Sequence, residues 1–295
     1  MTAQKPTDHP PSRISASRLR ARKVSSGSAP LVMITTYDAP HARLVEAAGI
    51  DLILVGDSVG TTVLGYDSTV QVTLDDIIHH ARAARRGAPN THIIADMPFG
   101  AYEVSNEQAV ASAVRLIQDG HADSVKLEGG VRIEDRIRAI TNAAIPVVGH
   151  VGLLPQTAAS SGGMKVRGRT LGEARAIIAD ANAVAGAGAS LCVLEMVPAG
   201  LAQRITATLP IPTIGIGAGD ACDGQVLVIN DLLGMDQRFS PRFLKRYADL
   251  ETTIREAVST WSRDVREGAY PTDEHSFALP DDIASALDDI PGQER

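Results

Sequence analysis

The sequence predicts a (β/α)8 barrel, with helices around a closed parallel sheet, and three observations support this fold class. Eight short runs rich in Val, Ile and Leu recur between residues 31 and 231. Most of them are followed by an amphipathic stretch with helix-start signals, an alternation typical of βαβ units. The runs are almost continuously apolar, which indicates strands buried on both faces. Eight such units over roughly 200 to 250 residues favour a closed barrel, and an open doubly wound sheet is the alternative.

The predicted strands are short and separated by helical patterns. They cover residues 31–38, 51–58, 92–99, 124–130, 146–152, 190–198, 212–219 and 224–231. One connection does not fit this scheme, because only Asp220 to Asp223 separate the last two runs, which is too few residues for a covering helix. We therefore expect either a single helical turn there or a later start of the eighth strand.

Four predicted helices begin after a residue that can cap the first turn: Thr73, Ser105, Thr170 and Ser240. Ser105 and Thr170 form capping boxes with Gln108 and Glu173, respectively. Ser240 is followed by Pro241, which suits the first turn of a helix. The helix after Ser240 is expected to be the last of the barrel.

The chain is predicted to have three parts. Residues 1–30 are polar and read as a leader or a contact helix, residues 31–264 form the catalytic barrel, and residues 265–295 form an acidic, solvated tail. With 44% hydrophobic and 21% charged residues, the composition is that of an ordinary globular protein with a full core.

Charge and composition exclude several classes of function. The net charge of -7 and the 3% of aromatic residues argue against a nucleic-acid partner, which needs a basic surface. No apolar run approaches the roughly 18 residues of a membrane span. Cys192 and Cys222 cannot build a disulfide framework, so a reducing, cytoplasmic compartment is expected.

Polar residues interrupt the apolar runs near their carboxyl ends, where the chemistry of such a barrel is expected. They are Asp57, Asp96, Lys126, Glu128, His150 and Glu195. Any one of them could be a cap or a satisfied core residue. Together they would place several carboxylates at one barrel mouth, where like charges repel unless a cation compensates.

Three of these carboxylates, Asp57, Asp96 and Glu128, are hard oxygen ligands suited to Mg²⁺. A zinc site is less consistent with the sequence, because His150 has no second His or Cys at ligand spacing. Glu195 lies in an apolar run, an environment that suits a general base.

Lys126 and Glu128 lie two residues apart on one predicted strand, so their side chains share a face. A buried ion pair adds little stability, because both charges must be desolvated. Lys126 could bind a substrate carboxylate or could simply be the partner of Glu128.

Two glycine-bearing segments are further candidates for ligand contact. In "GIGAGDACDG", Gly215, Gly217 and Gly219 are followed by Asp220 where a dinucleotide fingerprint has a glycine, so close packing at the barrel mouth, or room for a ligand there, explains the glycines better. The cationic segment 157–169 reads as a mobile cover over the mouth, with an ordinary surface loop as the alternative.

Several motifs together resemble one family, that of the ketopantoate hydroxymethyltransferases. They occur in order from about residue 14 to residue 277, and they are "TTYDAPHARL", "LVGDS", "LGYDST", "ADMPFGAYE", "VKLEGG", "GHVGLLPQ", "LEMVP", "IGIGAG", "CDGQVLV" and "DEHSF". The resemblance implies a barrel of the phosphoenolpyruvate/pyruvate-binding type, a cytoplasmic homo-oligomer, commonly a decamer, and Mg²⁺ as the metal. It also implies transfer of a hydroxymethyl group from 5,10-methylenetetrahydrofolate to 3-methyl-2-oxobutanoate, giving 2-dehydropantoate for pantothenate biosynthesis.

The resemblance assigns a role to each matching position. It implies metal ligation by Asp57, Asp96 and Glu128, and proton abstraction by Glu195. It implies contacts with the oxo acid by a further set: Asp57, Ser58, Asp96, Lys126 and His150. Met164 and Arg167 depart from the Phe and Gln that the family usually has in the cover segment, which leaves the folate contacts open.

Two other functions are compatible with parts of this pattern. A Mg²⁺-dependent C–C lyase or mutase acting on an oxo acid would use the same barrel type, but such enzymes often carry a reactive cysteine in a "KKCGH"-like loop, which this sequence lacks. A non-catalytic binding or scaffold protein would not bring the strand-end acids together.

Overall fold

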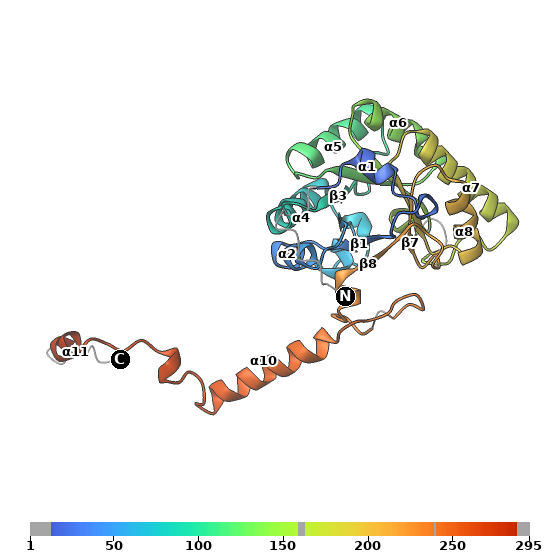
Figure 1. The fold of residues 1–295 in the computed structure, drawn as a ribbon. Coiled ribbons are helices and arrows are strands. Elements are labelled where there is room, and N and C mark those ends of the chain that lie inside the picture. The colour runs from blue at the N-terminus through green and yellow to red at the C-terminus, as the bar shows by residue number, and fades with distance from the viewer. Residues whose placement is uncertain (1–12, 159–162, 239, 288–295) are drawn as a thin grey trace, which may run out of the picture.

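Eight parallel strands close into a barrel in the computed structural model, which describes residues 13–158, 163–238 and 240–287 (Figure 1). The strands are β1 (Leu31–Thr35), β2 (Leu52–Val55), β3 (His92–Asp96), β4 (Ser124–Glu128), β5 (Val147–Gly152), β6 (Leu191–Glu195), β7 (Thr213–Ile216) and β8 (Gly224–Val228). Consecutive strands pair in parallel, and β1 also pairs with β8, from Leu31 opposite Gly224 to Thr35 opposite Val228. This closure confirms the predicted barrel and rules out the open sheet.

Helices cover the outside of the barrel (Figure 1). They are α2 (Ala39–Ala47), α4 (Leu74–Gly87), α5 (Asn106–Gln118), α6 (Glu134–Asn142), α7 (Leu171–Gly186) and α8 (Ala199–Thr208), with the single turns α3 (Val59–Thr62) and α9 (Ile229–Leu232) after β2 and β8. The predicted caps at Thr73, Ser105 and Thr170 are confirmed, since each side chain accepts a hydrogen bond from the N–H three residues later. The box predicted at Ser105 is incomplete, because Gln108 Oε1 accepts from Val104 N at 3.0 Å instead.

The prediction for the connection between β7 and β8 is wrong. β8 begins at Gly224 as drawn, and residues 217–223 contain no helical turn. Asp223 folds back on β7, where its Oδ2 accepts from Thr213 N at 3.0 Å. A Cβ added at Gly224 would lie 2.4 Å from Leu31 O, so β8 packs closely against β1 from its first residue.

The helix predicted to begin after Ser240 begins nine residues later than expected, as α10 (Leu250–Arg266). Its N-cap is Asp249, whose side chain accepts from Thr252 N at 3.2 Å. The preceding segment is tied to α9, because Tyr247 N–H donates to Leu232 O (2.8 Å) and Leu250 N–H to Leu233 O (3.0 Å). These tertiary hydrogen bonds outweigh the local capping signal at Ser240.

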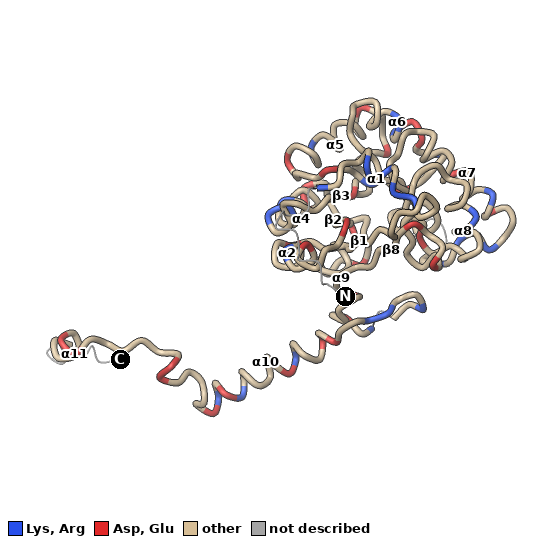
Figure 2. Tube along the Cα trace, viewed as in Figure 1, with Lys and Arg blue, Asp and Glu red and all other residues tan. Residues whose placement is uncertain are grey.

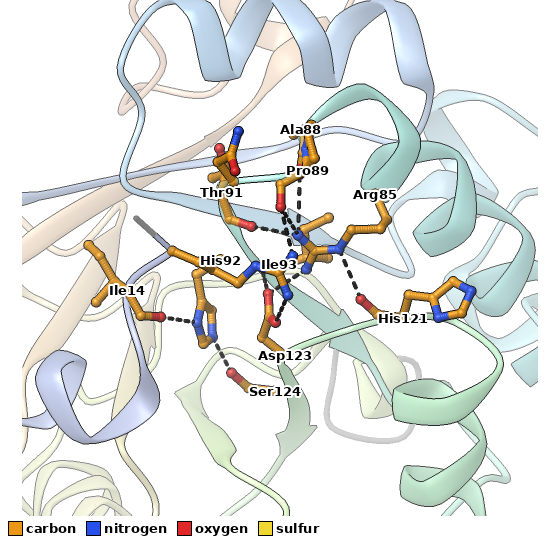
Figure 3. A network of polar contacts seen from close by, with 12 residues as sticks. Ile14, Arg85, Ala88, Pro89, Thr91, His92, Ile93, His121, Asp123 and Ser124 are labelled. Atoms are coloured by element: carbon orange, nitrogen blue, oxygen red, sulfur yellow. Dashed lines mark hydrogen bonds and ion pairs between the residues drawn. The ribbon is translucent and has the colours of Figure 1, made fainter. Parts of the chain in front are cut away.

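The short helix α1 (Ala16–Arg20) closes the N-terminal end of the barrel. Leu19 is fully buried in the apolar cluster that the strands form inside the barrel. Beside it, Figure 3 shows Arg85 reaching Asp123 and His92 bonding to Ile14 O, the latter at 2.8 Å. Arg13 also pairs with Asp123, at 2.9 Å. Residues 13–20 are therefore a contact element of the barrel.

The C-terminal part leaves the barrel. α10 projects away from it, and none of its residues is buried (Figure 1). The boundary predicted at residue 264 falls inside this helix. Beyond it lie η5 (Asp273–His275) and α11 (Asp281–Leu287), and acidic residues recur along this largely exposed stretch (Figure 2). Within the described ranges, no helix is long and apolar enough for a membrane crossing.

Replacing Gly149 in β5 by Ala is expected to lower the free energy of unfolding by about 1–3 kcal/mol. A Cβ there would lie 2.2 Å from Val184 Cγ1, so α7 would have to move away from the sheet. Gly172→Ala in α7 is the control, because nothing lies within 4 Å of a Cβ added at Gly172. Urea unfolding measures both, and a G149A variant as stable as wild type would contradict this packing.

Candidate active site

Five of the six strand-end charges are buried together at the carboxyl ends of β2 to β5. They are Asp57, Asp96, Lys126, Glu128 and His150. The strand register places Asp96 beside Lys126 and Glu128 beside His150. Glu195, at the end of β6, has a side chain that is 17% exposed. The predicted site is therefore a buried charged cluster with one partly accessible carboxylate.

Lys126 pairs with Asp96, at the end of the neighbouring strand β3. Its Nζ lies 3.0 Å from Asp96 Oδ1. The alternative prediction, in which Lys126 is the partner of Glu128, is therefore wrong. Burial alone would lower the pKa of Lys126, but Asp96, Glu128 and Asp57 outweigh it and raise the pKa above the usual value. Lys126 is thus a permanent cation among three carboxylates.

Asp57 and Asp96 contact each other directly, because Asp57 N–H donates to Asp96 Oδ2 at 2.9 Å. Burial, reinforced by Asp96 and Glu128, raises the pKa of Asp57 well above its ordinary value. Burial also raises the pKa of Asp96, against the lowering effect of Lys126. The pair therefore lacks positive charge even with Lys126 in place.

His150 connects the cluster to Glu195. Its Nδ1 lies 3.5 Å from Glu128 Oε1, and its Nε2 lies 3.2 Å from Glu195 Oε2. Burial and the nearby Lys126, whose Nζ is 3.3 Å from Nδ1, favour the neutral ring. The hydrogen bonds to Glu128 and Glu195 outweigh them and raise the pKa of His150 to about 9. Against burial, His150 in turn lowers the pKa of Glu128.

Ser58 lies at the edge of this cluster, at the start of α3. Its Oγ is 2.8 Å from the hydroxyl of buried Tyr37, and Thr62 Oγ1 donates to the same hydroxyl at 3.2 Å. A Cβ placed on Gly56 would lie 3.0 Å from Ser58 Oγ and 3.4 Å from Asp96 Oδ2. Ser58 and Asp96 therefore border the same small space, which only a glycine leaves open.

The carboxylates suit a hard cation by their chemistry. Asp57 and Asp96 offer buried oxygen atoms, and a cation beside Asp57 would counter the burial and the neighbouring Asp96 and Glu128 that raise its pKa. Across the described ranges, however, no three His, Cys, Asp or Glu side chains are arranged as a ready set of metal ligands. The donor set fits a divalent cation in charge and type, while Glu128 is engaged by His150 and Gln156.

Two uncharged residues that the sequence analysis missed hold the carboxylates. Gln156, in η4 (Pro155–Thr157), donates from Nε2 to Asp57 Oδ2 at 2.8 Å and from its backbone N–H to Glu128 Oε2 at 3.0 Å. Tyr102 OH bonds to Gln156 Oε1 at 2.6 Å. Both residues lie in the quoted motifs "GHVGLLPQ" and "ADMPFGAYE", but a search restricted to charged residues passes over them.

The predicted cover segment begins beside this site. Of its residues, 159–162 lie outside the described part of the chain. Arg167 N–H donates to Met196 O at 2.9 Å, directly after Glu195. Met196 has a left-handed backbone, with φ at 50°, which is uncommon for a residue other than glycine. The segment is thus anchored where Glu195 is accessible, and Met164 is exposed.

Comparison with known proteins gives a consistent result. Residues 13–273 match the family described as ketopantoate hydroxymethyltransferase. A relative from Heliobacterium modesticaldum named 3-methyl-2-oxobutanoate hydroxymethyltransferase is 54% identical over 253 residues, which is 86% of this chain and 92% of that protein.

Solved structures with the same fold are much more distant in sequence. A 2,3-dimethylmalate lyase of the PEP mutase/isocitrate lyase superfamily is 17% identical, with a TM-score of 0.55 over 92% of this chain and 97% of that one. A phosphonopyruvate hydrolase in complex with oxalate and Mg²⁺ is 13% identical, with a TM-score of 0.57 over 89% and 93% of the two chains. At these identities the likeness establishes the fold alone.

Proposed function

The chain belongs to the ketopantoate hydroxymethyltransferase family, and on that premise we propose that it transfers a hydroxymethyl group from 5,10-methylenetetrahydrofolate to 3-methyl-2-oxobutanoate. The product is 2-dehydropantoate. The observation that carries this proposal is the unbroken series of contacts from Asp57 through Asp96, Lys126 and His150 to the partly exposed Glu195. This series supports the proposal, because an oxo acid bound beside it would have cationic groups and a base close to its C3 proton.

The proposed metal is Mg²⁺, held by Asp57 and Asp96 together with Glu128. When bound, it would supply Lewis acidity that favours the enolate form of the oxo acid. Support comes from the chemistry of the buried carboxylates and their shortage of positive charge. The distant phosphonopyruvate hydrolase with oxalate and Mg²⁺ shares only the fold.

The chain's own residues have distinct roles in the proposed reaction. Lys126 binds the substrate carboxylate as a point charge, and Ser58 borders the same space. Glu195 removes the C3 proton, and His150 orients it through the 3.2 Å contact between Nε2 and Oε2. Water breaks the two C–N bonds that hold the methylene carbon of the folate, so that tetrahydrofolate leaves and this carbon is released as formaldehyde. The enolate carbon then adds to the formaldehyde carbon, and the formaldehyde oxygen takes up a proton to become the new hydroxyl group.

The competing functions are less consistent with these findings. The lyase and mutase alternative corresponds to structures that are at most distant relatives, such as the lyase at 17% identity, whereas the transferase relative is 54% identical. The scaffold alternative predicts scattered acids, but the contacts described above bring Asp57, Asp96 and Glu195 into one cluster.

The proposal is tested by following the C3 proton of 3-methyl-2-oxobutanoate by NMR in heavy water, with protein and Mg²⁺ but no folate. Loss of this signal isolates enolisation from carbon transfer, and a sample without protein is the control. If the signal persists with folate absent and also with tetrahydrofolate added, the proposed chemistry is wrong.

We also propose a homo-oligomer, up to the decamer that the family resemblance implies, in the cytoplasm. On α10, Ile254, Val258, Trp261 and Val265 repeat at helical spacing and are 45–57% exposed, an apolar face that a second copy could cover. Light scattering that gave the 31.0 kDa of one chain would contradict the assembly.

The two free, buried cysteines are consistent with the proposed reducing, cytoplasmic compartment. Recovery of the protein outside the cytoplasm in cell fractionation would contradict this location.

A further inference from the structure

One buried glutamine connects two carboxylates that come from different strands. Gln156 follows β5 and is 4% exposed. Its side-chain amide donates to Oδ2 of Asp57, the residue that follows β2, at 2.8 Å. Its backbone N–H donates to Oε2 of Glu128, the last residue of β4, at 3.0 Å. A single residue therefore holds one oxygen of each carboxylate.

The amide has only one orientation that satisfies its surroundings. Its Nε2 also donates to Met97 O at 2.9 Å, and a carbonyl oxygen can only accept. Its Oε1 faces Tyr102 OH at 2.6 Å, and the same hydroxyl accepts from Glu128 N at 3.3 Å. Both amide hydrogens and the amide oxygen are thus used, and a flipped side chain would lose the hydrogen bonds to Asp57 and Met97 O and turn its own oxygen toward theirs.

This arrangement constrains what the carboxylates can offer to a ligand. Asp57 Oδ2 and Glu128 Oε2 are committed to donors on Gln156, and Glu128 Oε1 faces His150. Each of these contacts uses one lone pair of a carboxylate oxygen, so Asp57 Oδ1 and the remaining lone pairs of both carboxylates stay available to a cation. Because the carboxylates are already fixed by these hydrogen bonds, they lose less conformational entropy when a cation binds than mobile carboxylates would.

We infer that Gln156 and Tyr102 form a positioning pair that holds Asp57 and Glu128 ready for the divalent cation, so that cation affinity depends on two uncharged residues. This inference rests on the proposed function. The pair does not touch the reacting atoms: Gln156 acts through the carboxylates, and Tyr102 acts through Gln156.

The test is isothermal titration of the purified full-length chain with MgCl₂ alone, without oxo acid or folate. Gln156→Met keeps the length of the side chain and removes the amide that donates to Asp57 Oδ2 and Met97 O, while the backbone N–H that donates to Glu128 remains. It should weaken Mg²⁺ binding about 10- to 100-fold, the usual effect of losing such a supporting hydrogen bond. Tyr102→Phe removes one hydroxyl and should weaken binding in the same direction by less. Gln225→Met is the matched control, because Gln225 donates to Gly219 O at 2.9 Å and contacts no site carboxylate.

Two further readouts separate positioning from simple loss of structure. Thermal melting in EDTA establishes that each variant is folded, and Tyr102→Phe serves if Gln156→Met is not. Raising the Mg²⁺ concentration should restore kcat of the variants towards wild type, which a damaged fold would not allow. Equal Mg²⁺ affinity in wild type and both variants overturns the inference, whereas a wild-type chain that binds no Mg²⁺ overturns the metal part of the proposed function.

Discussion

Replacing Glu195 by Gln is expected to lower kcat by about 10²- to 10⁴-fold while the oxo acid still binds, because the variant loses only the general base. Gln keeps the size of the side chain, and its amide oxygen can still accept from His150 Nε2, which lies 3.2 Å from Glu195 Oε2 in the native protein. Steady-state kinetics measure the loss of rate, and titration with 3-methyl-2-oxobutanoate measures binding.

The control for this prediction is Glu134→Gln, which removes a carboxylate paired with Arg138 on the exposed surface of α6. It should leave kcat within about a factor of two of wild type, since surface changes of this kind have small effects. The E195Q variant should also stop C3 exchange in heavy water. Near wild-type turnover by E195Q would refute the assignment of Glu195 as the base.

Replacing Lys126 by Met is expected to reduce the free energy of unfolding by about 3–5 kcal/mol at pH 8, measured without added metal. Lys126 is buried, and its Nζ is 3.0 Å from Asp96 Oδ1, so removing it leaves buried carboxylates without their cation. Urea unfolding compares this variant with Lys245→Met, whose ammonium lies over the exposed ring of Tyr247 and should matter little.

The pH dependence of that loss follows from the carboxylates. The pKa values of Asp57 and Asp96 are raised in the folded protein, so each group stabilises the fold most when protonated and loses that contribution as the pH rises through its folded pKa. Without Lys126 these pKa values rise further. The destabilisation should therefore shrink as the pH is lowered from 8 to 5, and a loss that is constant over this range would contradict uncompensated charge as its cause.

Both predictions concern charged residues at buried strand ends, where apolar residues would be expected. The carboxylates and Lys126 are costly to bury, since each charge loses its hydration. Lys126 offsets part of that cost at Asp96, and His150 offsets part of it at Glu128. The remaining negative charge at Asp57 is what a bound cation would offset.

Much of the fold was predictable because its signals are local. The apolar runs fall where the eight strands lie, and the caps at Thr73 and Thr170 begin α4 and α7 as expected. The helix after Ser240 was predicted wrongly, because its start depends on the hydrogen bonds of Tyr247 and Leu250 to α9, which a local pattern does not contain. For the same reason, the turn between β7 and β8 could not be derived from its length alone.

For the candidate site, the sequence by itself determined which charges lie at the strand ends, because in a parallel barrel all carboxyl ends meet at one mouth. Only the tertiary structure decided their partners: Lys126 with Asp96, His150 between Glu128 and Glu195, and Gln156 between Asp57 and Glu128. The physical reason is that alternation along one strand sets the face of a side chain. Which atoms it meets depends on strand register and on loops from other parts of the chain.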